Sequence, residues 1–129
     1  MSKEILVINS NPLLNLVHQG PIDIGVINRV PGFTMHAEGK GVNVARVLSR
    51  LGQSVTVTGF AGGHSGAWLK DLVQEEGITE AFVETLAPMR VGFMASPSEF
   101  AHPTTLLPGG FKVTDQECHE LFDRVDALL

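Results

Sequence analysis

The sequence has little of the residues that build disulfides, base-stacking surfaces or membrane spans. Its 129 residues include one cysteine, Cys118, so the chain can form neither an internal disulfide nor a cysteine-based metal cluster, as is usual in a reducing cytosol. Tyrosine is absent and there is one tryptophan, which leaves little material for stacking nucleic-acid bases. No apolar stretch is long enough to cross a bilayer, and the first residues lack a signal-peptide pattern. We therefore expect a cytoplasmic protein without a membrane partner.

Basic charge is also scarce. Nine lysines and arginines stand against fourteen aspartates and glutamates, and the formal net charge is −5. Because no basic run occurs, nucleic acid is not expected as a partner. Apolar residues make up 43% of the chain, which is enough for a buried core and argues against disorder. The length suits one compact domain, expected over residues 1–129.

What is present is an alternation of apolar runs and helical spacings. The run EILVIN at residues 4–9 is typical of a buried strand of a parallel sheet. Residues 22–36 contain Pro31-Gly32 and predict two short strands around a turn. Further strands are predicted within residues 54–58, 78–85, 90–96 and 103–110.

Three helices are predicted between these strands. The first covers residues 42–51, where Val44, Val47, Leu48 and Leu51 share one face and Gly52 follows the end. The second covers residues 67–76, before Gly77. The third follows Thr114 and Glu117, which have the spacing of a capping box, and its expected apolar face is Cys118, Leu121, Phe122, Val125 and Leu128 or Leu129. The order predicts a layered α/β fold with a mostly parallel sheet, from which residues 22–36 and 90–107 project as a small second sheet.

The stretch that carries chemistry is Gly39-Lys40-Gly41, with Asn43 two residues later. Glycines allow a ligand to approach the backbone, and a helix that begins here directs free N–H groups towards it. With a lysine added, the pattern suits an anionic or polyhydroxylated ligand. It is neither a Walker loop nor GxGxxG, whose last glycine is replaced by Val44. Spacing alone favours the alternative, a glycine turn with a solvated lysine and an asparagine cap.

A collinear series of motifs resembles the PfkB/ribokinase family of carbohydrate kinases, especially its phosphofructokinase and tagatose-phosphate kinase branch. GKGVNVARVLSRLG resembles the family signature GGKGxNxA. NSNPLLN resembles NPALD, GVINRV a strand ending in NR, and TGFAGGHSGAWLKDLVQEEGI the GFLGG segment with its helix. APMRVGF resembles the TRxN strand, and PTTLLPGG resembles TEINEPG.

The resemblance implies a ribokinase-like three-layer α/β fold with a small β lid over the sugar. It implies transfer of the γ-phosphoryl group of ATP, with Mg²⁺, to a sugar or sugar phosphate. The substrate contacts that it implies are Asn15, Gly39, Lys40, Asn43 and Arg90, with Arg29 added from the lid. For Arg90 and Arg29 an ordinary surface arginine is the alternative, and for Arg29 that alternative is preferred.

The sequence departs from the family at ligand-facing positions. Glu38 stands where the family has glycine, and a carboxylate there should repel a phosphate. Asn15 replaces an aspartate and Met89 a threonine, while Leu106 and Leu107 replace the polar residues of TEIN. No late GxGD motif is present, so no catalytic residue and no ATP site are predicted, and the C-terminal half of the family fold is expected to be absent.

We therefore expect the substrate-binding half of such a kinase, inactive alone. The alternative is a non-catalytic sugar-phosphate-binding or interaction module derived from one. A homodimer through the lid strands or the sheet edge, or a separate chain that supplies the ATP half, would be compatible with either.

Overall fold

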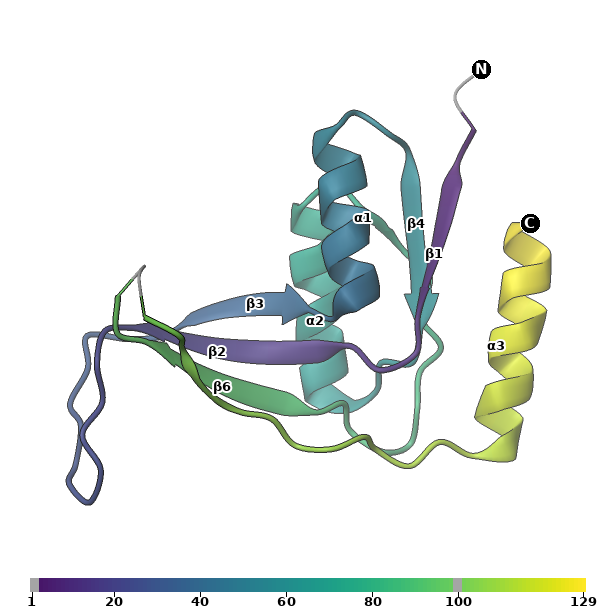
Figure 1. The fold of residues 1–129 in the computed structure, drawn as a ribbon. Coiled ribbons are helices and arrows are strands. Elements are labelled where there is room, and N and C mark those ends of the chain that lie inside the picture. The colour runs from purple at the N-terminus through teal and green to yellow at the C-terminus, as the bar shows by residue number, and fades with distance from the viewer. Residues whose placement is uncertain (1–2, 99–100) are drawn as a thin grey trace.

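The first sheet of the protein is parallel and lies between two layers of helices (Figure 1). The computed structural model describes residues 3–98 and 101–129. Strands β1 (Ile5–Asn9), β4 (Val55–Gly59) and β5 (Thr79–Glu80) pair in the order β1-β4-β5. Helices α1 (Lys40–Arg50) and α2 (Gly63–Glu75) cover one face, and α3 (Asp115–Leu128) lies on the other. This confirms the predicted three-layer α/β class.

A second, four-stranded sheet projects from these layers, as the resemblance implied for the lid (Figure 1). Its order is β3-β2-β6-β7, with bounds β2 (Leu13–Gln19), β3 (Thr34–Glu38), β6 (Val91–Ser96) and β7 (Thr104–Leu106). The pair β2 and β6 is parallel, and the two outer pairs are antiparallel. Residues 99 and 100 of the predicted segment 90–107 lie outside the described residues.

The strand pair predicted within residues 22–36 is wrong. Residues 20–33 form turns and irregular chain, where the Asn28 side chain bonds the backbone of Asp23 at 2.8 Å, and β3 begins only at Thr34. The partner of β3 is instead β2, which the sequence did not indicate. Leu13, Leu14, Asn15 and Val17 of β2 are all buried, so the strand lacks the alternation that marks a half-exposed strand.

The core joins the two sheets through the helices. Leu14 and Ala37 of the projecting sheet pack into the cluster that contains Val57 of β4 and Leu69 and Val73 of α2. From α1 the buried side chains are Val42 and Ala45. Of the predicted inward face of α1, Leu48 packs against the core as expected. Val44, Val47 and Leu51 do not, because they are 52%, 55% and 70% exposed. Apolar residues occur on two sides of this helix, and the side with Val42, Ala45 and Leu48 faces the core.

The start of α3 agrees with the prediction from the sequence, and the start of α2 does not. The capping box of α3 is confirmed: Thr114 Oγ1 accepts the Glu117 N–H at 3.1 Å, and Glu117 Oε1 accepts the Thr114 N–H at 2.9 Å. The expected apolar face of α3 stays largely uncovered, with Phe122 70% exposed. Helix α2 begins at Gly63, four residues before the predicted start.

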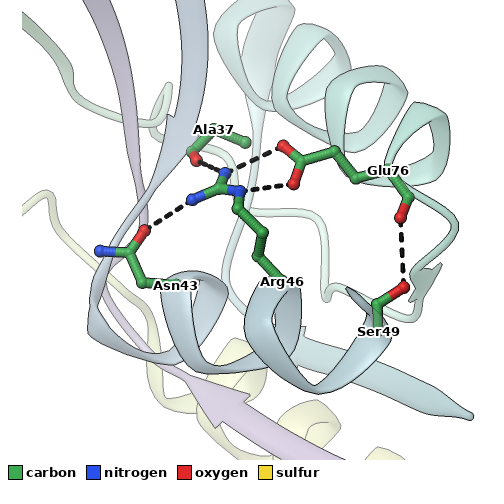
Figure 2. Close-up of polar contacts among 5 residues, drawn as sticks. All are labelled: Ala37, Asn43, Arg46, Ser49 and Glu76. Carbon is green, nitrogen blue, oxygen red and sulfur yellow. Dashed lines mark hydrogen bonds and ion pairs between the residues drawn. The ribbon is translucent and has the colours of Figure 1, made fainter. Parts of the chain in front are cut away.

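The position of α1 is fixed by Arg46 (Figure 2). Its guanidinium pairs with Glu76, which caps the end of α2, through Nε–Oε2 at 2.5 Å and Nη2–Oε1 at 2.9 Å. Nη2 also donates to the Ala37 carbonyl of β3 at 2.5 Å. The hydrogen bond with Glu76 raises the pKa of Arg46, and this effect outweighs burial, which lowers it. One side chain thus ties α1 to the end of α2 and to β3 of the projecting sheet.

Candidate functional site

The carboxyl end of β1 and the N-terminus of α1 meet at a pocket. Asn9, the last residue of β1, accepts the Gly41 N–H on its Oδ1 at 2.8 Å. The pocket beside this contact has a volume of about 320 Å³. Its lining residues are Ile8, Asn9, Ser10, Asn11, Gly39, Lys40, Gly41 and Arg90. In open parallel sheets this is where ligands bind, outside the carboxyl ends of the strands.

The charge of this pocket is positive. Lys40 and Arg90 line it, no acidic residue does, and within the described residues neither cation forms an ion pair. The N-terminus of α1, at Lys40, adds the partial positive charge of a helix start. The pocket therefore has the electrostatics of an anion site.

Arg90 is held in place by backbone carbonyls. Its Nε donates to Pro12 O at 3.2 Å, Nη2 to Asn11 O at 3.1 Å and Nη1 to Pro108 O at 3.2 Å. These contacts join the β1–β2 connection to the chain after β7, and they orient the guanidinium without neutralising its charge. A cation oriented in this way can meet an anionic ligand with little further loss of side-chain entropy.

The glycines at 39 and 41 are needed because Asn9 lies against them. Gly39 has φ +129°, and a Cβ there would lie 2.7 Å from Asn9 Nδ2. A Cβ at Gly41 would lie 2.7 Å from the Cβ of Asn9. Both distances are shorter than any normal contact, so a side chain at either position would displace Asn9 or the loop.

Three of the six predicted site residues, Gly39, Lys40 and Arg90, line this pocket, and Asn15 does not. Asn15 is 1% exposed, and its Nδ2 donates to Glu38 Oε2 at 3.0 Å across β2 and β3. The Glu38 carboxylate, expected beside the anion, is thus engaged by an amide and is not part of the pocket lining.

Asn43 and Arg29 also lie outside the lining. Asn43 Oδ1 accepts Arg46 Nη1 at 2.8 Å (Figure 2), and the residue is exposed on α1. Arg29 is exposed in the irregular segment between β2 and β3. The roles of all six residues stay predictions.

Sequence reasoning missed Asn9, which is 7% exposed and central to the pocket. The available signal was its place at the end of the first predicted strand. In a parallel sheet that end faces the loop that opens the following helix.

Three larger pockets have other chemistry. One of about 690 Å³ lies at the start of α3 and is lined by Glu84, Glu117 and Glu120 with no cation. Another of about 510 Å³ on the projecting sheet is lined by apolar residues such as Leu16, Phe93 and Leu106. The third, of about 410 Å³, lies between the end of β2 and the start of β3. No lysine or arginine lines any of the three.

Within residues 3–98 and 101–129, no helix has the length and apolar content that crossing a membrane requires.

Comparison with known proteins assigns the family. The model of the pfkB family of carbohydrate kinases matches residues 14–116, which is most of the chain. The chain belongs to this family. Among curated pfkB relatives, the 1-phosphofructokinase of Vibrio cholerae is 38% identical over 92 residues, and that of Escherichia coli is 36% identical over 115 residues.

A solved structure of a related kinase has the same fold. The crystal structure of phosphofructokinase-2 from Escherichia coli in complex with fructose-6-phosphate superposes with a TM-score of 0.87 at 25% identity, covering 98% of this chain. The matches cover 70% and 88% of this chain for the two 1-phosphofructokinases. The same matches cover 29% of the Vibrio 1-phosphofructokinase and 36% of the Escherichia one. The superposition covers 42% of the phosphofructokinase-2 chain, so this chain spans less than half the length of each of the three proteins.

Proposed function

We propose that this chain is the substrate-binding part of an ATP-dependent sugar or sugar-phosphate kinase of the phosphofructokinase type, and that it is inactive alone. The observation that carries the proposal is the pocket at the start of α1, with Lys40 and Arg90 on its lining and no acidic residue among them. Membership of the pfkB family supports a sugar as the ligand, and the similarity to 1-phosphofructokinases supports a phosphorylated one.

In this proposal the phosphate of the sugar binds between the two cations. The planar guanidinium of Arg90 suits paired phosphate oxygens, and Lys40 adds a point charge at the helix start. Asn15 and Asn43 would contact sugar hydroxyls. The Asn15 Nδ2 already donates to the Glu38 carboxylate, but its buried Oδ1 has no partner among the described residues and is the atom that would accept a sugar hydroxyl. Arg29 would approach from the loop before β3.

ATP and Mg²⁺ do not fit the residues present. Among the described residues, no group of three or more histidine, cysteine, aspartate or glutamate side chains could hold a metal ion. The sequence also has no GxGD motif. We therefore assign no step of phosphoryl transfer to this chain, and the nucleotide half of the site would come from elsewhere.

A non-catalytic sugar-phosphate-binding module is the second candidate. The Asn15–Glu38 hydrogen bond favours it, because both residues depart from the family pattern and the Asn15 Nδ2 donates to the Glu38 carboxylate. A sensitive kinase assay on the chain, with ATP, Mg²⁺ and fructose phosphates, separates the candidates when it is repeated with an added nucleotide-binding half of a pfkB kinase. Turnover by the chain alone would contradict both.

Thermal melts test the binding proposal directly. Since a ligand that binds only the folded state raises the melting temperature, Tm should rise with fructose 1-phosphate or fructose 6-phosphate and without nucleotide. Lys40→Gln should abolish the rise, whereas Lys70→Gln, which removes the same charge from α2 outside the pocket, should retain it. A cooperative melt that no sugar phosphate shifts would overturn the proposal.

A further inference from the structure

Asn9 carries a hydrogen-bond donor that nothing in the described residues accepts. The side chain is 7% exposed, its Oδ1 accepts the Gly41 N–H at 2.8 Å, and its Nδ2 is buried without a partner. Buried donors are almost always paired in folded proteins, by protein groups, water or ligand. An unpaired one beside a pocket therefore needs an explanation.

The orientation of the amide is fixed by its surroundings. If Oδ1 and Nδ2 were exchanged, the NH₂ group would face the Gly41 N–H, donor against donor. Nδ2 consequently lies on the Gly39 side, where a Cβ would be only 2.7 Å away. No side chain at residue 39 can cover it, because that residue is glycine.

We propose that Asn9 is a further binding residue of this pocket, whose Nδ2 N–H donates to an anionic phosphate oxygen at the start of α1. This rests on the proposed function and adds a residue to its site. By accepting the Gly41 N–H, Asn9 withdraws one of the backbone donors that a helix start offers to an anion. It presents its own N–H in exchange, and Lys40 and Arg90 belong to the same pocket lining.

The sharpest variant is Asn9→Asp. It keeps the size of the side chain and an acceptor for the Gly41 N–H, but it replaces the free N–H with an oxygen. The matched control is Ser10→Asp, which adds the same charge to the same lining and leaves the Asn9 amide in place. Isothermal titration with fructose 1-phosphate should show that Asn9→Asp weakens binding about tenfold more than Ser10→Asp does. Equal losses in the two variants would overturn the proposal.

A second measurement needs no variant and so does not depend on its folding. In the wild-type protein, the side-chain NH₂ resonances of Asn9 should shift on saturation with fructose 1-phosphate, while those of Asn28, in the loop before β3, should stay in place. Unmoved Asn9 resonances in a saturated protein would contradict the contact.

Inorganic phosphate separates this inference from the proposed function. If the protein binds phosphate in an Asn9-dependent way but distinguishes no sugar phosphate, the substrate proposal fails and Asn9 remains a binding residue. If it binds fructose 1-phosphate and Asn9→Asp behaves as Ser10→Asp does, the substrate proposal stands and the Asn9 inference fails. If the wild type binds neither ligand, both fail.

Discussion

Arg46 joins its own helix to a strand and to the end of another helix. It reaches Glu76 at the end of α2, the Ala37 carbonyl of β3 and Asn43 on its own helix (Figure 2). The side chains of Arg46 and Glu76 are 18% and 30% exposed, so solvent screens the pair only in part. The pair therefore differs from an ordinary surface salt bridge, which contributes little.

Arg46→Lys should destabilise the protein by about 1–3 kcal/mol, because one ammonium cannot replace a bidentate pair and a backbone contact together. Urea unfolding followed by circular dichroism measures the difference. Arg50→Lys, an exposed arginine one turn later on α1, should cost almost nothing. Equal effects of the two variants would show that the cluster contributes nothing beyond a surface charge.

Glu38 carries a negative charge beside the pocket without belonging to its lining. Its carboxylate accepts the Asn15 amide at 3.0 Å and precedes Gly39 in the chain. Glu38→Gln keeps an acceptor for that amide and removes the negative charge. If the proposed anion site is correct, fructose 1-phosphate should bind roughly two- to fivefold more tightly to this variant than to the wild type, measured by calorimetry.

Glu84→Gln removes an exposed charge outside the pocket lining and serves as control. Weaker binding to the Glu38 variant would show that the carboxylate helps the ligand.

At the scale of elements, the start of α3 depends on Glu117. Its Oε1 accepts the Thr114 N–H and its Oε2 accepts the Leu86 N–H at 2.9 Å, so one carboxylate joins α3 to the chain after β5. The hydrogen bond from Thr114 is the main cause that lowers the pKa of Glu117, and the bond from Leu86 adds to it against the effect of burial.

A lowered pKa makes this stabilisation dependent on pH. It is fully present above the ordinary glutamate pKa, near 4.3, and it is lost as the pH falls through the lower value of the folded state. Glu117→Gln should therefore lower Tm at pH 7, and the gap to wild type should close under acid conditions. Glu120→Gln removes the same charge from the next turn of α3 and isolates the capping contribution. A gap that stays constant through the acid range would contradict the ionised contact.

The elements that the sequence predicted well carry local signals. The capping box has a fixed spacing, and the run at β1 is apolar and ends at a turn sequence. Strand β2 was not predicted because it is buried on both faces and so lacks an alternating pattern. Its pairing also depends on distant residues, which lie 17 to 25 positions away in β3 and much farther along the chain in β6. The inward face of α1 was predicted only in part, because valines occur on both sides of the helix and the spacing of Val44, Val47 and Leu51 does not show which side meets the sheet. The position of Asn9 at the end of β1 was a sequence signal, but its contact with Gly41 depends on how β1 and α1 pack together.

Strand β2 joins the projecting sheet to the core. Leu14 is 2% exposed and belongs to the same buried cluster as Leu69 of α2. Leu14→Ala should therefore cost about 2–5 kcal/mol of unfolding free energy, because it leaves a cavity between the two parts. Leu106 of β7 is 66% exposed, and Leu106→Ala should change stability by about 0.5 kcal/mol or less. Urea denaturation checks both, and similar costs would mean that the projecting sheet is not coupled to the core through β2.

For the whole molecule, three exposed apolar side chains lie in one loop outside the pocket lining. In the segment between β2 and β3, Ile24 is 89% exposed, Val26 63% and Ile27 82%, on the projecting end of the molecule (Figure 1). Patches of this kind commonly mark protein–protein contacts. A second copy of the chain, paired through the projecting sheets, would remove these side chains from water and leave the pocket at the start of α1 open.

The dimer prediction follows from that arrangement. Light scattering after size exclusion should give twice the mass of one chain, and Ile24→Lys should shift the protein to the monomer by placing a charge in the apolar contact. Leu86→Lys is the matched control, since Leu86 is also 89% exposed but lies in the pocket at the start of α3. If both variants remain dimeric, the contact lies elsewhere, and the unpaired edge of β1 becomes the surface to test. If the wild type is monomeric at every concentration, the chain needs a different partner to cover its projecting end.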